Sequence, residues 1–308
     1  MSGMRTTADL RKKNSFKRHW QKHVMMLPCL GLLLLFQYVP MVGLVMAFQN
    51  YVPSNGYFGS EWVGLYWFKY MFNMGNFGSV VWNTLFISIL KITTALFSSV
   101  VLALMLNEMA SKRLKTLIQS AILFTYFISW IVLSDIVKDI VAQDGAVNQI
   151  IRSLGGEGIS FLTDDKWFIV LLIVTNIWKE IGYNAVIISA ALSAIDPALY
   201  EAADLDGANR FQKIRFITVP AIGTTVAMLL ILALGGVLSG GFDQIHNLYN
   251  STVLSSSDII DTYVFRMGIN RGMYSLGTAV GFFKSVVGAV LLVSSHKAAE
   301  KYAGYRVF

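Results

Sequence analysis

The chain has 308 residues, of which 55% are hydrophobic and only 14% are charged, and its formal net charge is +7. A soluble domain carries about 25% charged residues, so this composition argues against a soluble enzyme and against a disordered chain. Cys29 is the single cysteine of the sequence, which excludes an intrachain disulfide and a cysteine-rich zinc site.

Six stretches are long and apolar enough to cross a bilayer, which takes about 20 residues in a helix. The predicted spans are 24–48, 80–106, 116–137, 167–195, 217–238 and 278–295. The first stretch is too long for the apolar core of a signal peptide and lacks a small-residue cleavage pattern, so we expect it to be retained. The fold class predicted is an all-α membrane protein with six transmembrane helices.

The basic residues predict the orientation, because cytoplasmic loops are enriched in Lys and Arg. Sixteen basic residues fall on the side that holds both termini and five fall on the opposite side. We therefore expect both termini in the cytoplasm of a cell-membrane protein. The predicted parts are a basic segment 1–23, a membrane domain 24–295 and a tail 296–308. Anchoring to anionic lipid explains segment 1–23, so we expect no nucleic-acid partner.

The loop after the first span, 49–78, is rich in Tyr, Trp and Phe. Aromatic side chains gather at membrane interfaces, and an interfacial belt is the favoured interpretation. A surface that receives an external partner is the alternative.

Polar side chains inside spans are costly, about 2.5–3.5 kcal/mol for an ion at the bilayer centre, and usually face a partner or a water-filled path. Two interpretations stay open for them: they line a path, or they pair with another subunit or reach the interface. The candidates for the path are Asn176, Lys179, Glu180, Tyr183 and Asn184 in the fourth span, and Asn83 in the second. For Lys91 and Lys284 we favour pairing or the interface. Glycines near the end of the fifth span indicate unwinding or close packing: Gly235, Gly236, Gly240 and Gly241.

The local structure of the inside loop 196–220 can be predicted from its sequence. Asp196 is a good N-cap and Pro197 suits the first helical position, which predicts a helix over 197–206. Gly207 suits the left-handed residue that ends it, and a second short helix is predicted over 210–216. The structural alternative is a simple amphipathic connector on the membrane surface.

The same loop carries a family motif. Glu201-Ala202-Ala203, Gly207 six residues after Glu201, and then Ile217 and Pro220 resemble the EAA signature of ABC importer permeases; Val219 stands where Leu is usual. The segments FDQIHNLYN and GTAVGFFKSVVG are similar to polysaccharide-type, binding-protein-dependent sugar permeases. The resemblance touches almost the whole chain and implies the type I importer permease fold.

The resemblance also implies the partners. The chain would pair with a second homologous permease, would couple to a cytoplasmic ATPase dimer that holds ATP and Mg, and would receive a sugar from an extracytoplasmic binding protein. The implied coupling residues are Glu201, Ala202, Ala203, Asp206, Gly207 and Arg210. The expected function is a permease subunit for sugars, specifically oligosaccharides, with no cofactor or metal on this chain.

The sequence contains no phosphate-binding GxxxxGK[ST] loop and no HExxH or GxSxG motif, so ATP hydrolysis is expected on another chain and a hydrolase is disfavoured. An ion-coupled secondary carrier, with Lys179 and Glu180 as its ion site, is the alternative function.

Overall fold

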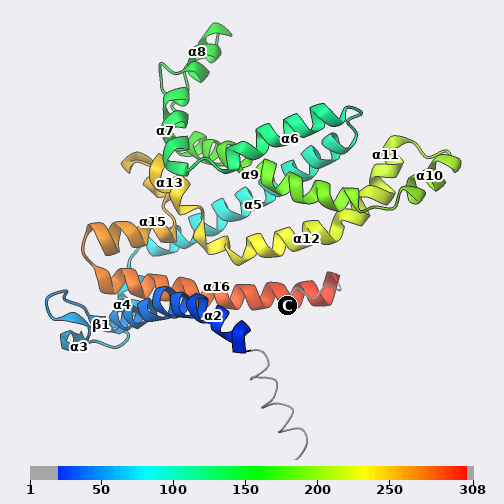
Figure 1. Ribbon diagram of the computed structural model, residues 1–308. Coiled ribbons are helices and arrows are strands. Elements are labelled where there is room, and N and C mark those ends of the chain that lie inside the picture. Colours follow the sequence, from blue (N-terminus) through cyan, green and yellow to red (C-terminus); the bar gives the residue numbers. More distant parts are fainter. Residues whose placement is uncertain (1–19, 304–308) are drawn as a thin grey trace, which may run out of the picture.

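The computed structural model describes residues 20–303, except for the side chains of 295, 296 and 298–303. Most of the predicted basic segment 1–23 and the end of the tail 296–308 therefore lie outside the described residues. The described chain is almost entirely helical, and a pair of two-residue antiparallel strands is its one sheet (Figure 1).

Five helices within the described residues are long and apolar enough to cross a membrane, at Trp20–Phe48, Phe77–Asn107, Asp165–Ser193, Arg210–Gly235 and Tyr274–Ser294. They match the first, second, fourth, fifth and sixth predicted spans. The first joins α2 (Trp20–Leu33), the π-helix η1 (Leu34–Tyr38) and the 3-10 helix η2 (Val39–Phe48). The others are α5 (Phe77–Asn107), α9 (Asp165–Ser193), α11 (Arg210–Lys213) with η3 (Ile214–Thr218) and α12 (Val219–Gly235), and α16 (Tyr274–Ala303).

The third predicted span, 116–137, is not one continuous helix. It divides into α6 (Lys112–Tyr126) and α7 (Trp130–Val141), and the chain bends by 101° between the segments Lys112–Tyr126 and Trp130–Ser153. The cause is local, because Ser129 is an N-cap whose side chain accepts a hydrogen bond from the Val132 N–H and so starts a new helix. This bent pair is the sixth span if it counts as one.

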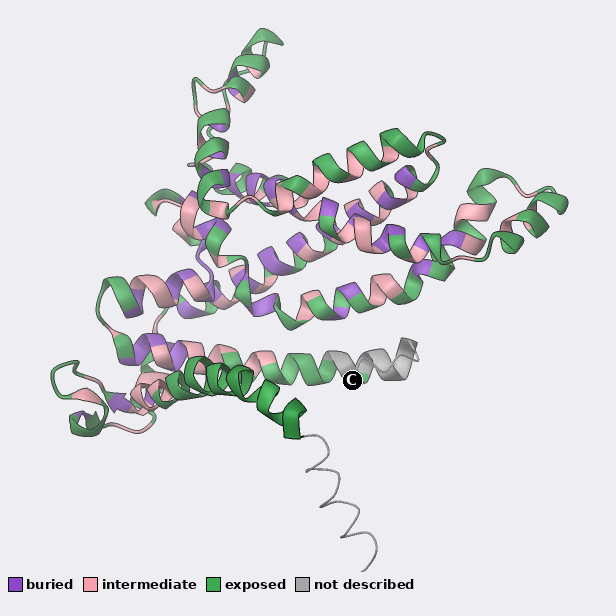
Figure 2. Cartoon of the chain, in the orientation of Figure 1, coloured by how far each residue is buried: buried purple, intermediate pink, exposed green. Residues whose placement is uncertain are grey.

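The core lies between α5 and α9, which pack along much of their length, with α6 on one side of α9 and α12 on the other. Gly182 lets α6 approach α9 closely, since a Cβ there would lie 2.6 Å from the Ile122 carbonyl oxygen. The first span instead lies along the outside, where η2 packs on α16, and nearly all of it is exposed in the isolated chain (Figure 2).

Short elements gather at the two ends of this helical body. At one end, α10 (Pro197–Leu205) and α11 project beyond the long helices (Figure 1). The remaining elements, away from α10, are β1 (Gln49–Asn50), α3 (Gly56–Gly59), β2 (Glu61–Trp62), α4 (Tyr66–Asn73), α8 (Ala146–Ser153), η4 (Val237–Ser239), α13 (Phe242–Leu248), η5 (Ser251–Val253), α14 (Leu254–Ser257), α15 (Ile260–Val264) and η6 (Phe265–Asn270).

Candidate functional site

The loop 196–220, here called the EAA loop, folds as its sequence predicts. The Asp196 side chain accepts a hydrogen bond of 2.9 Å from the Ala198 N–H and begins α10 with Pro197 at its first position. The helix ends at Leu205, and Gly207 follows at φ 75°, a left-handed conformation that glycine adopts without strain. The predicted helix and its glycine stop are confirmed.

The motif residues of the EAA loop face outward. Glu201, Ala202, Asp206, Gly207 and Arg210 are exposed, and Ala203 is half-buried. Leu205 is 91% exposed. A short helix that presents small and apolar side chains to the outside is a suitable element for docking into a groove on another protein.

The second half of the EAA loop starts with a capping box. The Asn209 side chain accepts from the Gln212 N–H, and the Gln212 side chain accepts from the Asn209 N–H. The helix then continues through the π-helix η3 into α12, so the predicted second helical segment is present and is continuous with the fifth span.

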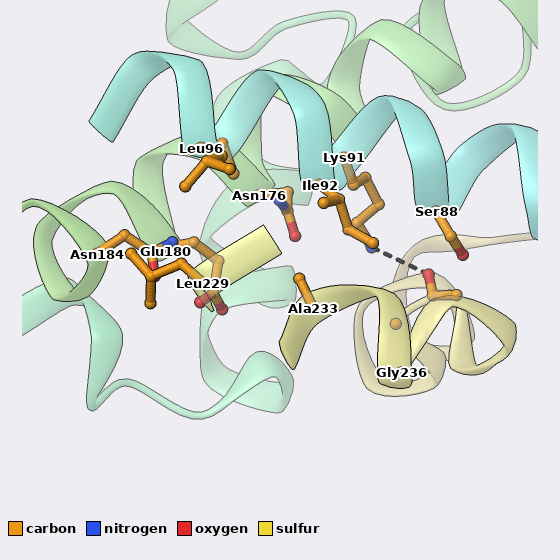
Figure 3. Close-up of a pocket in the computed structure, with 13 residues that line it drawn as sticks. Ser88, Lys91, Ile92, Leu96, Asn176, Glu180, Asn184, Leu229, Ala233 and Gly236 are labelled. Atoms are coloured by element: carbon orange, nitrogen blue, oxygen red, sulfur yellow. Dashed lines mark hydrogen bonds between the residues drawn. The ribbon is translucent and has the colours of Figure 1, made fainter. Parts of the chain in front are cut away.

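A cavity of about 360 Å³ lies within the helical body, between α5, α9 and the last turns of α12 (Figure 3). Its lining mixes apolar and polar side chains: Ser88, Lys91, Ile92, Ala95, Leu96, Asn176, Glu180, Asn184, Leu229, Ala233, Gly236, Gly240 and Gly241. This size and mixture are typical of sites that hold a small polar molecule.

One end of the cavity is formed where the fifth span breaks. Gly240 and Gly241 both have positive φ, 57° and 81°, so of the two interpretations left open, unwinding or close packing, the backbone at this pair fits unwinding. The buried Lys91 amine donates a hydrogen bond of 3.1 Å to the Gly240 carbonyl. A Cβ on Gly241 would collide with that amine, and φ 81° is itself a conformation that side-chain-bearing residues rarely adopt, so a substitution here would be strained and would displace the amine. The Ser88 hydroxyl beside them is buried and has no hydrogen-bond partner within the described residues.

The predicted polar stripe of the fourth span is split between two places. Asn176, Glu180 and Asn184 line the cavity, spaced four residues apart (Figure 3). Lys179 and Tyr183 face the break between α6 and α7, where the Tyr183 ring stacks on Tyr126 at 4.5 Å. One helical turn takes 3.6 residues, so residues four apart are rotated slightly relative to one another. Positions 176, 180 and 184 therefore lie along one edge of the stripe, and positions 179 and 183 lie along the other.

Lys179 provides hydrogen-bond partners for main-chain carbonyls at the break in the third span. Its amine donates to the Tyr126 carbonyl at 2.8 Å and to the Ile128 carbonyl, and it lies 5.7 and 5.5 Å from the Tyr126 and Trp130 ring centroids. Carbonyls at a helix break inside a membrane need such partners because water is scarce there.

Asn83 lies away from the cavity. Its amide donates to the Ser255 carbonyl at 3.0 Å and the Asp258 carbonyl at 3.4 Å, which joins α5 to the short helices of that end. Asp258 in turn holds Arg266 through a two-armed ion pair. Burial is the largest single effect on the Arg266 pKa and lowers it, but the hydrogen bond and the charge of Asp258 together raise the pKa by more, so the net shift is upward.

Sequence reasoning placed two lysines differently. Lys284 reaches Asp261 of the same chain at 2.6 Å rather than an interface or another subunit, and Lys91 enters the cavity. The sequence shows the glycine pair that Lys91 contacts. It does not show that the second span approaches this pair, because that approach is a tertiary contact. Within residues 20–303, no three His, Cys, Asp or Glu side chains gather closely enough to hold a metal ion.

The chain matches known transport proteins over most of its length. Residues 99–298 match the family described as "Binding-protein-dependent transport system inner membrane component". Protein LplB of Bacillus subtilis (strain 168) is 41% identical over 94% of this chain and 91% of its own length. The polygalacturonan/rhamnogalacturonan transport system permease protein YteP of the same strain is 40% identical over 96% and 92%.

A solved structure has the same architecture. A chain of a bacterial ABC transporter involved in the import of the acidic polysaccharide alginate is 35% identical and superposes with a TM-score of 0.88 over 95% of this chain and 99% of its own. The predicted ABC importer permease fold is thereby confirmed. The chain belongs to the binding-protein-dependent transport system inner membrane components, and is therefore a transport subunit of an ABC importer rather than an enzyme.

Proposed function

We propose that this chain forms one half of the path of an ABC importer for oligosaccharides, with both termini in the cytoplasm. The likeness to the alginate importer chain carries the proposal, because it extends over 95% of this chain and includes the cavity-forming helices. A second structure of the alginate transporter contains a periplasmic protein with a bound alginate pentasaccharide. A similar binding protein would deliver the sugar here, and a second, homologous permease would complete the path.

In this proposal the EAA loop docks on a cytoplasmic ATPase that binds ATP and Mg. The exposed Glu201 and Ala202 and the half-buried Ala203 supply the contact, and Asp206, Gly207 and Arg210 shape the turn that follows. The exposure of the motif supports this assignment, since α10 has no buried residue in the isolated chain. ATP-driven closure of the ATPase would move α10 and change the access of the path.

The cavity is the proposed place where sugar passes this subunit. Asn176 and Asn184 offer amide donors and acceptors for hydroxyls, while Glu180 accepts and Lys91 donates. Lys179, Tyr183 and Asn83, which sequence analysis placed on the path, would support its walls through the α6–α7 break and the α5 contact.

The alternative, an ion-coupled carrier with a Lys179–Glu180 site, receives no support. Lys179 bonds main-chain carbonyls, and Glu180 faces the cavity instead. Family membership points to ATP as the energy source.

The coupling assignment is tested by co-expression with the neighbouring permease, ATPase and binding protein. Glu201→Lys reverses the exposed charge, and Gly207→Pro cannot hold φ 75° because proline fixes φ near −65°. We expect the double variant to lose ATPase in affinity purification and to lose uptake. Glu157→Lys, an exposed glutamate after α8, is the matched control and should retain both. Intact association and uptake in the double variant would refute the assignment.

The path assignment is tested with a panel of labelled alginate, galacturonan and rhamnogalacturonan oligosaccharides in proteoliposomes. Asn176→Leu and Asn184→Leu should reduce uptake while ATPase association stays intact. Asn73→Leu makes the same change at the exposed end of α4 and serves as the control. Uptake equal to the wild type in both cavity variants would refute the path assignment.

A further inference from the structure

A closed ring of polar contacts ties α10 to the first turn of the fifth span. The Tyr200 hydroxyl on α10 lies 2.9 Å from the Thr218 hydroxyl in η3. Thr218 donates to the Lys213 carbonyl at 3.3 Å, and the Lys213 amine returns to the Asp204 carboxylate on α10 at 2.5 Å. The ring therefore starts and ends on α10 and passes through α11 and η3.

The direction of the ring follows from its atoms. The Thr218 hydroxyl has one hydrogen, and the Lys213 carbonyl can only accept, so Thr218 donates that hydrogen to Lys213. Tyr200 must then be the donor to Thr218. Thr218 is only 2% exposed, so water competes poorly for this chain of hydrogen bonds.

Apolar packing beneath α10 is sparse. An open hollow of about 350 Å³ lies beside α10 at the ends of α9 and α12, and Leu199, Ala191 and Ala221 are among the residues that line it. No residue of α10 is buried. Within residues 20–303, the side chains of Tyr200 and Asp204 make the polar contacts that join α10 to α11 and η3.

The ring leaves the motif free. Tyr200 and Asp204 are four residues apart and share one face of α10. Glu201 and Leu205, one position further along in each case, are exposed. The same helix can therefore hold the fifth span with one face and present the other face to a partner.

We propose that Tyr200, Thr218, Lys213 and Asp204 form a coupling brace that makes α10, α11 and the start of α12 move as one body. These four are positioning residues, and the inference rests on the proposed docking of α10 on the ATPase. Without the brace, α10 would shift across the hollow beneath it when the ATPase moves, and the fifth span would not follow.

The first experiment measures the rigidity of the loop in the paired permeases without the ATPase, because Leu205 lies on the face of α10 that is proposed to dock. Spin labels replace Leu205 on α10 and Met228 on α12, both exposed, in a Cys29→Ser background. Pulsed EPR of the paired permeases should give one narrow distance for the wild type and a broad distribution for Tyr200→Phe and Thr218→Val. Thr218→Ser keeps the hydroxyl and should restore the narrow distance.

The second experiment measures transmission in the assembled complex. Ala233 lines the cavity and is replaced by cysteine in the Cys29→Ser background. The rate at which maleimide labels this cysteine reports the accessibility of the cavity in the absence of a sugar. We expect the change in this rate on ATP addition to fall about three- to tenfold in Tyr200→Phe and Thr218→Val, the range expected for one lost hydrogen bond. Asp204→Ala removes the acceptor at the exposed side of the ring and should act in the same direction, which keeps the test valid if a buried variant folds poorly.

The two proposals fail in different ways. If the wild-type complex does not retain the ATPase, the docking proposal is refuted, while the spin-label distance still reports on the brace. Narrow distances and wild-type labelling changes in Tyr200→Phe and Thr218→Val, with the ATPase retained, would overturn the brace alone.

Discussion

Replacing Lys179 by methionine should destabilise the break in the third span. The lysine amine is a partner of two main-chain carbonyls there, those of Tyr126 and Ile128. Leaving a buried carbonyl without its partner costs about 1–3 kcal/mol, and two carbonyls lose theirs. Part of this cost is offset, because methionine carries no charge and the desolvation penalty of the buried ammonium disappears. We therefore expect Lys179→Met to lower the free energy of unfolding by about 2–4 kcal/mol.

The measurement is denaturant unfolding in mixed micelles, followed by tryptophan fluorescence, to which Trp130 beside the break contributes. The matched control is Lys138→Met in α7, whose amine lies 3.4 Å from Asp135 in a pair with exposed fractions of 40% and 72%. An exposed pair of this kind contributes about 0–1 kcal/mol. Equal stability losses in the two variants would show that Lys179 does not hold the break.

Three further substitutions test other features of the fold. Gly241→Ala forces an alanine to φ 81° and against the Lys91 amine, so we expect a loss of at least about 1–2 kcal/mol in the same unfolding assay; Gly223→Ala, with open space around it, should be neutral or stabilising. Gly182→Ala places a Cβ 2.6 Å from the Ile122 carbonyl and should separate α6 from α9, read as a lower melting temperature and faster proteolysis between these helices. Asp258→Asn leaves Arg266 without its anion, with Asp258 only 6% exposed, and should cost about 3 kcal/mol, whereas wild-type stability would show the pair to be dispensable.

Local sequence signals predicted what local chemistry decides. Asp196, Pro197 and Gly207 set the bounds of α10 through capping and a left-handed stop, and the structure follows them. The glycines near the end of the fifth span likewise lie where the regular helix stops: α12 ends at Gly235, and the chain turns at Gly240 and Gly241. Each of these features depends on a few neighbouring residues, so no tertiary information is needed.

The errors lie where distant segments meet. The third span reads as one apolar stretch, yet its break at Ser129 is stabilised by Lys179 from another helix. That same contact draws Lys179 away from the cavity and splits the predicted polar stripe. Lys91 shows the reverse effect, since a lysine expected at an interface is held inside by the Gly240 carbonyl. Polar groups buried in spans find their partners across helices, and spacing along one helix does not reveal those partners.

The fifth span is the element that can connect the two proposed sites. Its α12 segment has 17 residues and is therefore about 25 Å long, with the brace residue Thr218 before its first turn and the short helix η4 between its end and Gly240. Because α12 is a continuous helix, a displacement of its first turn would carry along it to Leu229 and Ala233, which line the cavity. The glycine pair is then the point where the motion is absorbed, since two consecutive left-handed glycines bend more easily than a regular helix. Brace variants should therefore uncouple the EAA loop from α12, whereas Gly241→Ala should keep α10 and α12 together and obstruct the change at the cavity. In the spin-label and labelling experiments, this predicts a narrow α10–α12 distance combined with a reduced ATP-dependent labelling change for Gly241→Ala; a broad distance would contradict the assignment of separate roles to the two ends of the span.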